Sequence, residues 1–296
     1  MKVRKAVIPA AGFGTRFLPA TKSMPKEMLP IVDKPIIQYV VEELVDSGIT
    51  DVIIVTGYHK RSIEDHFDAP SRELIENLKL GGSSKAPLIE ATERIADMAN
   101  FYYVRQKGPY GNGTPVLNAR HIVGDEPFAV LWGDQFTWAE TPRLKQCLST
   151  FEQTGNPVLS GVRLARPEDA SRYGIFDVEP TNDPHTFHMR GIVEKPEPAE
   201  APSDLLADGC YVLTPDIFDE LAALNPGKGG EIWLTDAIEH LREKRPFSVR
   251  EIAGGQYFDT GNKLEYLKTN VEFALRRDDL GPDFRAFLEG VLRRDA

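Results

Sequence analysis

Residues 3–27 read VRKAVIPAAGFGTRFLPATKSMPKE, and this stretch decides what kind of fold the chain adopts. Residues 3–9 are a short, mostly apolar run rich in β-branched side chains. A glycine-rich segment follows at once, with Gly12 and Gly14 two positions apart. Because β-branched residues favour strands and glycine breaks them, the pattern predicts a buried first strand that leads directly into a loop.

The first half of the chain continues with alternating strand and helix patterns. Residues 36–45 carry apolar side chains at helical spacing, and Gly48 marks the end of that helix. Further strands are expected at 51–55, 101–104 and 128–132, and further helices at 60–67, 71–79 and 115–122. We expect Thr114 to cap the last of these, with Pro115 in its first position. This alternation is typical of a parallel sheet covered on both faces.

After residue 155 the pattern changes. Strands are expected at 158–164, 175–178, 187–193, 211–213 and 247–252, and helices at 215–224, 233–243, 262–276 and 282–294. No internal repeat is visible, and no linker divides the chain. We therefore expect an α/β, Rossmann-like fold with a mixed central sheet over residues 1–261, followed by a C-terminal helical extension over 262–296 that closes the domain or contacts another subunit.

Composition excludes several classes of protein. The 35 basic and 45 acidic residues give a net charge of −10, which argues against nucleic acids and anionic membranes as partners. No apolar run approaches the roughly 18 residues of a membrane span, and residues 1–11 are a poor signal peptide. Cys147 and Cys210 are too few for a disulfide framework or a four-cysteine zinc site. We therefore expect a cytoplasmic protein with buried, inert thiols.

The glycine loop lies in a locally positive segment. Residues 1–34 hold seven basic side chains and two acidic ones, which favours a small anionic ligand. A dinucleotide-binding fingerprint fails because Phe17 stands at the third glycine position, and no GK[ST] follows to make a P-loop. From composition alone, a phosphate-binding loop and a plain turn with solvated cations both remain open.

Gly12–Lys26 resembles the signature G-x-G-T-R-x-x-P-x-T-x-x-x-P-K of the sugar-1-phosphate nucleotidylyltransferases. Other segments resemble the bacterial UTP–glucose-1-phosphate uridylyltransferases of that family, namely residues 26–30, 33–39, 123–127, 194–196, 234–237 and 259–263. The resemblance implies a nucleotidyltransferase fold and a catalytic domain over residues 1–261.

The resemblance also implies roles for particular residues. Nucleotide-binding positions would be Ala11, Gly12, Gly14, Glu27, Gln106 and Gly111. In the family the glutamine reads the uracil edge, the glycine that matches Gly111 brings backbone to the base, and Arg16 and Lys26 match residues that contact the triphosphate. There is one departure, since Thr114-Pro115 stands where many uridylyltransferases have His-Ala.

The sugar and metal positions come from the same resemblance. Gly174, Glu194 and Lys195 would bind the sugar phosphate, and Asp134 and Asp259 would hold Mg²⁺. Asp134 follows an apolar strand pattern, and ligands bind at the carboxyl ends of parallel strands. Mg²⁺ needs few carboxylates, because water and phosphate oxygens complete its coordination. The pair His185 and His188 has metal-like spacing, but no third ligand accompanies it.

The expected reaction is transfer of UMP from UTP to glucose 1-phosphate, which gives UDP-glucose and pyrophosphate. Arg16, Lys26 and Lys195 are the expected catalytic residues. Three alternatives stay open: a related enzyme that uses dTTP or another hexose 1-phosphate, an inactive sugar-nucleotide-binding regulator, and an NAD(P) oxidoreductase, which the missing third glycine disfavours. We expect small-molecule substrates as partners, neither nucleic acid nor membrane, and a homo-oligomer, either dimer or tetramer.

Overall fold

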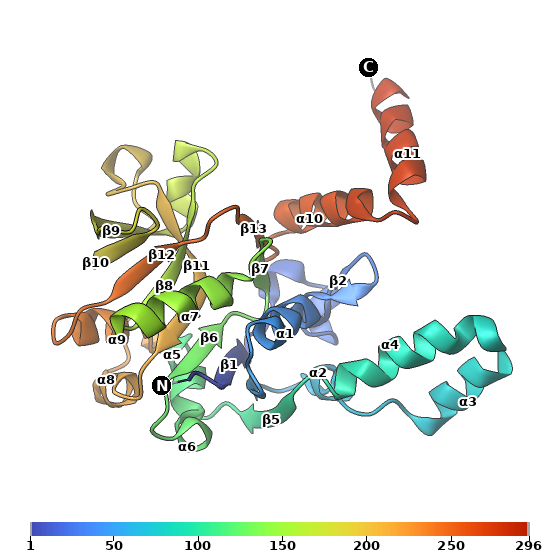
Figure 1. Ribbon diagram of the computed structural model, residues 1–296, viewed down its shortest axis with the longest axis horizontal. Coiled ribbons are helices and arrows are strands. Elements are labelled where there is room, and N and C mark those ends of the chain that lie inside the picture. Colours follow the sequence, from blue (N-terminus) through green and yellow to red (C-terminus); the bar gives the residue numbers. More distant parts are fainter. Residues whose placement is uncertain (1, 295–296) are drawn as a thin grey trace.

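The computed structural model describes residues 2–294 of the chain (Figure 1). Nine strands within this range form the central sheet: β1 (Lys5–Ala10), β4 (Asp51–Thr56), β5 (Asn100–Arg105), β6 (Phe128–Leu131), β8 (Val158–Arg163), β9 (Gly174–Pro180), β10 (Thr186–Glu194), β11 (Leu205–Leu213) and β12 (Ser248–Glu251). Their spatial order is β5-β4-β1-β6-β11-β8-β12-β10-β9.

The sheet is mixed. Strands β5, β4, β1 and β6 are parallel, with Lys5 opposite Asp51 on one side and Phe128 on the other. Strand β11 runs antiparallel to both β6 and β8, and β9 and β10 form an antiparallel pair at the far edge. The expected α/β fold with a mixed central sheet is therefore confirmed, and its parallel half comes from the first 140 residues, as expected.

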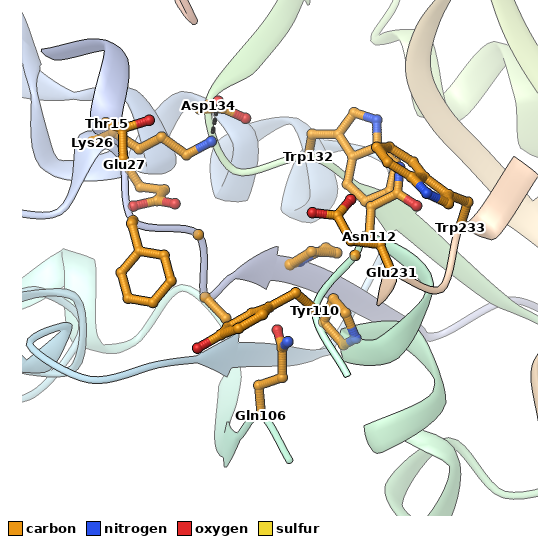
Figure 2. Close-up of a pocket in the computed structure, with 16 residues that line it drawn as sticks. Thr15, Lys26, Glu27, Gln106, Tyr110, Asn112, Trp132, Asp134, Glu231 and Trp233 are labelled. Atoms are coloured by element: carbon orange, nitrogen blue, oxygen red, sulfur yellow. Dashed lines mark hydrogen bonds and ion pairs between the residues drawn. The ribbon is translucent and has the colours of Figure 1, made fainter. Parts of the chain in front are cut away.

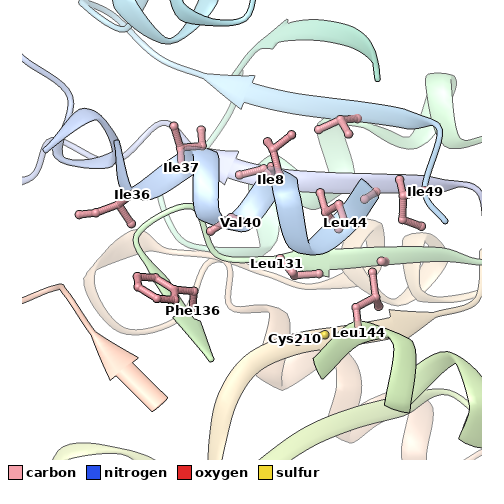
Figure 3. Close-up of a cluster of buried hydrophobic side chains, with 14 of the residues drawn as sticks. Ile8, Ile36, Ile37, Val40, Leu44, Ile49, Leu131, Phe136, Leu144 and Cys210 are labelled. Carbon is pink, nitrogen blue, oxygen red and sulfur yellow. The ribbon is translucent and has the colours of Figure 1, made fainter. Parts of the chain in front are cut away.

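Helices cover both faces of the sheet because its strands are apolar on both sides. In β1, Ile8 packs toward one face, together with α1 (Ile36–Asp46) and α7 (Arg143–Thr154). Figure 3 shows Ile8 and Leu131 of the sheet beside Leu44 of α1 and Leu144 of α7. On the opposite face Val7 packs with α5 (Gly113–Asn118), α8 (Ile217–Ala223) and α9 (Leu234–Arg242).

Two helical arms extend from this body (Figure 1). The remaining α-helices in the described range are α2 (Arg61–His66), α3 (Arg72–Leu80), α4 (Ala86–Ala96), α6 (Arg120–Val123), α10 (Lys263–Arg276) and α11 (Gly281–Arg294). Helices α3 and α4 form one arm and contain no buried residue. Helix α10 packs on the core through Tyr266 and Phe273, whereas α11 buries only Gly281. Within residues 2–294 no helix has the length and apolar character that crossing a membrane requires.

Some local expectations were wrong or incomplete. Thr114 does not cap a helix, because α5 begins at Gly113 with Asn112 as its N-cap, so Thr114 and Pro115 lie inside the first turn. Helix α4 was not expected at all. Two small antiparallel pairs were also missed, namely β2 (Pro30–Ile31) with β3 (Lys34–Pro35) and β7 (Gln135–Trp138) with β13 (Gln256–Asp259). The two strands of the second pair lie far apart in sequence, so their pairing was not predictable, although the aromatic residues 257 and 258 indicate that Asp259 ends a strand.

Candidate functional site

A cavity of about 560 Å³ opens where three parallel strands end. Its wall includes residues 11–13 after β1, Gln106 after β5, and Trp132 and Asp134 after β6. Carboxyl ends of parallel strands lie at one edge of a sheet, so loops distant in sequence meet there. Of the expected site residues, the cavity wall contains Ala11, Gly12, Lys26, Glu27, Gln106, Gly111 and Asp134.

The two loop glycines have different reasons to be glycine. Gly14 adopts a left-handed backbone with φ of 65°, and a Cβ there would lie 3.2 Å from the Lys26 side chain. A Cβ on Gly12 would come no closer than 3.9 Å to any protein atom outside its neighbours, and that atom belongs to Lys26. Packing does not explain Gly12, whereas close approach of a ligand to the backbone does.

The second loop is held by a segment from the C-terminal half of the chain. Backbone bonds join Ile232 to Tyr110 (N–H to O, 2.8 Å) and Gly113 to Ile232 (N–H to O, 2.9 Å). Gly111 has φ of 114°, and a Cβ there would overlap the Ile232 backbone oxygen at 2.2 Å. The Asn112 side chain accepts the Leu234 N–H at 2.8 Å. This pairing brings residues 231–233 into the cavity wall beside Gly111.

Lys26 and Asp134 form a direct ion pair at one side of the cavity (Figure 2), with Nζ 2.5 Å from Oδ2. Burial alone would lower the pKa of Lys26, but the charges of Asp134 and Glu27 outweigh it, and the pKa is raised. Burial alone would raise the pKa of Asp134, but Lys26 outweighs it, and the pKa is lowered. Both groups are therefore charged at neutral pH.

Glu27 is also part of the cavity wall, but its side chain is almost fully buried. Its Oε2 accepts a hydrogen bond from Lys60 Nζ at 2.7 Å, and both side chains are almost fully buried. The other carboxylate oxygen, Oε1, has no hydrogen-bond partner in the part of the chain that the structure describes. Burial raises the pKa of Glu27, although the charges of Lys60 and Lys26 oppose the rise.

Asp134, Asp259 and Arg16 converge on Gly261. A Cβ on Gly261 would lie 2.9 Å from Asp259 Oδ1, 3.4 Å from Arg16 Nη1 and 3.9 Å from Asp134 Oδ2. Arg16 Nη1 donates to the Gly261 carbonyl at 3.4 Å. Asp259 ends β13, outside the main cavity wall, and its Oδ1 also accepts the Gly261 N–H at 2.9 Å. The turn after β13 thus brings the second aspartate toward the first.

This donor set fits a hard cation. Within residues 2–294 no three His, Cys, Asp or Glu side chains gather as a metal cluster, so a site at Asp134 and Asp259 would rest on two carboxylates. Mg²⁺ suits such a site, because its preferred ligands are oxygens and it keeps several waters or phosphate oxygens. Zn²⁺ would require nitrogen or sulfur donors that these residues do not supply.

The three expected sugar-phosphate residues lie together, apart from the main cavity. Gly174 of β9 pairs with Glu194 of β10, and the Glu194 carboxylate lies 3.3 Å from where a Cβ on Gly174 would be. Lys195 has a left-handed backbone with φ of 49°, its N–H bonds the Tyr173 carbonyl at 3.0 Å, and its Nζ lies 3.4 Å from Glu194 Oε1. Both charged side chains are more than half exposed.

An aromatic contact links this group to the cavity. Tyr211 is buried, and its ring meets that of Trp132 edge to face at 5.6 Å. Burial raises the pKa of Tyr211, and the charges of Asp208, Cys210 and Glu194 add to the rise. Gly174 lies against the same strand as Tyr211, because a Cβ on Gly174 would be 3.9 Å from the Cβ of Ala207 in β11.

The aromatic lining of the cavity was not predicted from the sequence. Phe13 and Tyr110, each more than 60% exposed, meet edge to face at 5.7 Å across its mouth. Trp132 and Trp233 lie at the other end, beside Glu231 (Figure 2). The sequence carried one usable signal, because Phe13 lies between two glycines and Tyr110 directly precedes Gly111. Trp233 had none, since only the backbone pairing of residues 110–113 with 232–234 brings it here.

Comparison with known proteins identifies the class. A family model described as nucleotidyl transferase matches residues 5–275, and the chain belongs to this family. The match extends into α10, so the division at residue 261 stays a prediction. Membership removes the NAD(P) oxidoreductase from the alternatives left open by the sequence.

The relatives within the family share one described activity. UTP–glucose-1-phosphate uridylyltransferase YngB of Bacillus subtilis is 49% identical over 99% of this chain and 97% of its own length. A second B. subtilis UTP–glucose-1-phosphate uridylyltransferase is also 49% identical, over 99% of both chains. The expected resemblance to bacterial uridylyltransferases is therefore confirmed over nearly the whole chain.

Solved structures of UDP-glucose pyrophosphorylases share this fold. A UTP-bound UDP-glucose pyrophosphorylase from Acinetobacter baumannii superposes with a TM-score of 0.88 and 37% identity, covering 97% of this chain and 99% of that one. A UDP-glucose pyrophosphorylase complexed with UDP-glucose gives a TM-score of 0.83 at 36% identity, covering 93% of this chain and 100% of that one. These matches confirm the nucleotidyltransferase fold.

Proposed function

We propose that the protein transfers UMP from UTP to glucose 1-phosphate and releases UDP-glucose and pyrophosphate. The observation that carries the proposal is the cavity where Lys26, Asp134 and Gln106 meet at the ends of three parallel strands. The relatives at 48–49% identity, named for this activity, support the choice of substrates.

The chemistry requires two anions to approach each other. The phosphate oxygen of glucose 1-phosphate attacks the α-phosphorus of UTP in line, and the bond from that phosphorus to the bridging oxygen of pyrophosphate breaks. The attacking oxygen is already charged, so no general base is needed. Catalysis then rests on alignment and on neutralising charge. Lys26 and Arg16 would contact the triphosphate, and Lys195 the sugar phosphate.

The Lys26–Asp134 pair prepares the site for this charge. In the free protein each group neutralises the other at 2.5 Å, so neither is left alone in a partly buried position. Phosphate oxygens would draw Lys26 away from Asp134. Asp134, with Asp259, would then be free to hold Mg²⁺, which supplies further neutralisation of the phosphates.

Different elements would bind the nucleotide and the sugar phosphate. Gln106 offers both an amide donor and an acceptor, which matches the alternating edge of uracil. Gly12 and Gly111 present backbone without side chains in this part of the cavity wall, so the base can approach the backbone closely, and we expect that base to be a pyrimidine. Glu194 would accept sugar hydroxyls beside Gly174, at the position that the resemblance to the family implies.

A substrate panel tests the proposal. Product formation is followed by ³¹P NMR with UTP, dTTP, ATP or GTP, each with several hexose 1-phosphates. We expect UTP with glucose 1-phosphate to give the highest kcat/KM. Some turnover of dTTP is compatible with the proposal, because one extra methyl group changes kcat/KM by only about 10–200-fold. Equal or better use of dTTP would favour a thymidylyltransferase, and tight binding of UDP-glucose without turnover would favour a regulator.

We also propose that the protein works as a homo-oligomer, either dimer or tetramer, in the cytoplasm. Large apolar side chains are exposed on the two arms, among them Leu80, Leu88, Phe287 and Leu292. Such residues, when they gather on one face, mark association surfaces. Cys147 and Cys210 are buried free thiols, in keeping with a reducing compartment. Sedimentation of the wild type and of Phe287→Glu tests the oligomer, and a monomeric wild type would contradict it.

A further inference from the structure

Lys60 is buried beneath the cavity, yet it is not part of the cavity wall. Its Nζ lies 2.7 Å from Glu27 Oε2, with side-chain exposures of 5% for Lys60 and 1% for Glu27. A lysine is seldom buried unless it is paired, because its charge loses the hydration of water. Glu27 is in turn the chain neighbour of Lys26, the residue placed against the triphosphate.

The loop that carries Lys60 is shaped to turn this side chain inward. It follows β4 and precedes α2, and Gly57 at its start lies so close to the glycine loop that a Cβ there would be 2.9 Å from the Ala11 carbonyl oxygen. His59 has φ of 59°, a left-handed conformation that costs energy for any residue except glycine. Tyr58 and His59 are exposed, whereas Lys60 is buried.

Two ion pairs bring four charges of alternating sign together in this part of the molecule. Lys60 pairs with Glu27, and Lys26 pairs with Asp134 at 2.5 Å. Figure 2 shows Glu27 beside Lys26 on the same wall of the cavity. Glu27 Oε1 has no hydrogen-bond partner within residues 2–294, so it is an unused acceptor close to Lys26. If Lys60 were absent, Lys26 would be the nearest cation able to neutralise Glu27.

We propose that Lys60 is a positioning residue that neutralises Glu27 and thereby keeps Lys26 directed toward Asp134 and the triphosphate. The inference rests on the proposed function only for the role of Lys26 in turnover. Lys60 itself touches no substrate. Its effect passes through Glu27, because a buried carboxylate without a partner attracts whatever cation is within reach.

The proposal predicts a specific pattern in a double-mutant cycle. Lys60→Met should lower kcat by about tenfold or more, within the range of a lost charge contact in the transition state. Lys60→Arg should recover most of the loss, since it keeps the charge. Glu27→Gln keeps the shape and one acceptor oxygen but removes the charge. In the Glu27→Gln background, Lys60→Met should change kcat by less than about threefold, because no buried charge then needs Lys60.

A matched control exists at the surface. Lys34 bonds Glu42 at the same 2.7 Å, but both side chains are about a third exposed, away from the cavity. Lys34→Met should leave kcat and both KM values unchanged. All variants are compared by thermal unfolding as well as by pyrophosphate release.

The outcomes separate the possible explanations. If Lys60→Met lowers kcat equally in the wild-type and Glu27→Gln backgrounds, Lys60 acts independently of Glu27 and the proposal is wrong. If the single variant fails to fold, the comparison between Glu27→Gln and the double variant still decides. A wild type that turns over a different nucleotide or sugar phosphate would overturn the proposed function alone, because the same cycle can be measured with those substrates.

Discussion

At the scale of single residues, the proposed transfer of UMP depends most on Lys26. It follows Pro25, lies 2.5 Å from Asp134, and has its pKa raised by the carboxylates around it. Lys26→Ala should reduce kcat by about 10²–10³-fold, because a charge contact made in the transition state is lost. The melting temperature should fall far less than turnover does, although Asp134 loses its partner. Steady-state kinetics with thermal unfolding checks this, and near-normal turnover in a folded variant would remove Lys26 from the site.

The Lys26–Asp134 pair also predicts a dependence of stability on pH. Its partner lowers the pKa of Asp134 in the folded protein below the ordinary 3.8. As pH falls toward and below 3.8, the unfolded chain therefore binds protons first, and the stabilisation from Asp134 is lost. On the basic side, Lys26 has a raised pKa, so its contribution fades only above its ordinary 10.5.

Denaturant titrations of the wild type and of Asp134→Asn test this pH dependence of stability. The stability advantage of the wild type should be present at pH 6 and should shrink as the pH is lowered to 3. A difference that is constant over this range would show that Asp134 has no lowered pKa. The same variant should lose Mg²⁺-dependent turnover at pH 7 while remaining folded.

At the scale of elements, one buried ionic cluster joins the helices over the sheet to the strand beside the cavity. Arg143 of α7 is fully buried and contacts both oxygens of Glu43 of α1, at 3.1 and 3.0 Å. Its Nη1 donates to the Asp208 carbonyl of β11 at 2.6 Å. The next residue, Gly209, has φ of 78° in a bulge of β11, where a Cβ would overlap Trp132. The cluster thus fixes the bulge on which Trp132 rests.

Arg143→Met should destabilise the protein by about 3–5 kcal/mol, because Glu43 and Asp208 would be left buried without their cation. Urea denaturation measures the loss. Arg120→Met is a suitable control, since Arg120 and Asp219 form a largely exposed pair at 2.8 Å and should contribute less than about 1 kcal/mol. Equal effects of the two substitutions would contradict the role of the buried cluster.

The site also shows which residues could be predicted from the sequence and which could not. Gly12 and Asp134 follow the ends of apolar strands, but the roles expected for them and for Lys26 came from the resemblance to the nucleotidylyltransferase family. Lys60, Trp233 and Asn112 were not predictable, because long-range contacts define their positions: the bond to Glu27 for Lys60, and the pairing around Ile232 for the other two. Thr114 was misjudged because its Thr-Pro pattern suits a helix start, but Asn112 begins the helix earlier.

At the scale of the whole molecule, the proposed site residues fall on the two halves of the sheet. The parallel half carries the glycine loop, Gln106 and Asp134, whereas β9 and β10 at the far edge carry Gly174 and Glu194. The nucleotide and the sugar phosphate would therefore meet over the end of β6. Glu194→Ala should raise the KM for glucose 1-phosphate at least several-fold more than that for UTP, and initial-rate kinetics with each substrate varied would reveal a reversed pattern.

The central claim is a single in-line displacement on the α-phosphorus of UTP by glucose 1-phosphate. UTP that carries one sulfur of known configuration at the α-phosphorus tests it most directly, with the configuration of the UDP-glucose product read by ³¹P NMR. The account predicts inversion at phosphorus, because one displacement occurs without a covalent enzyme intermediate. Retention of configuration, or failure to transfer the thiouridylyl group to glucose 1-phosphate when UTP itself also gives no UDP-glucose, would contradict it.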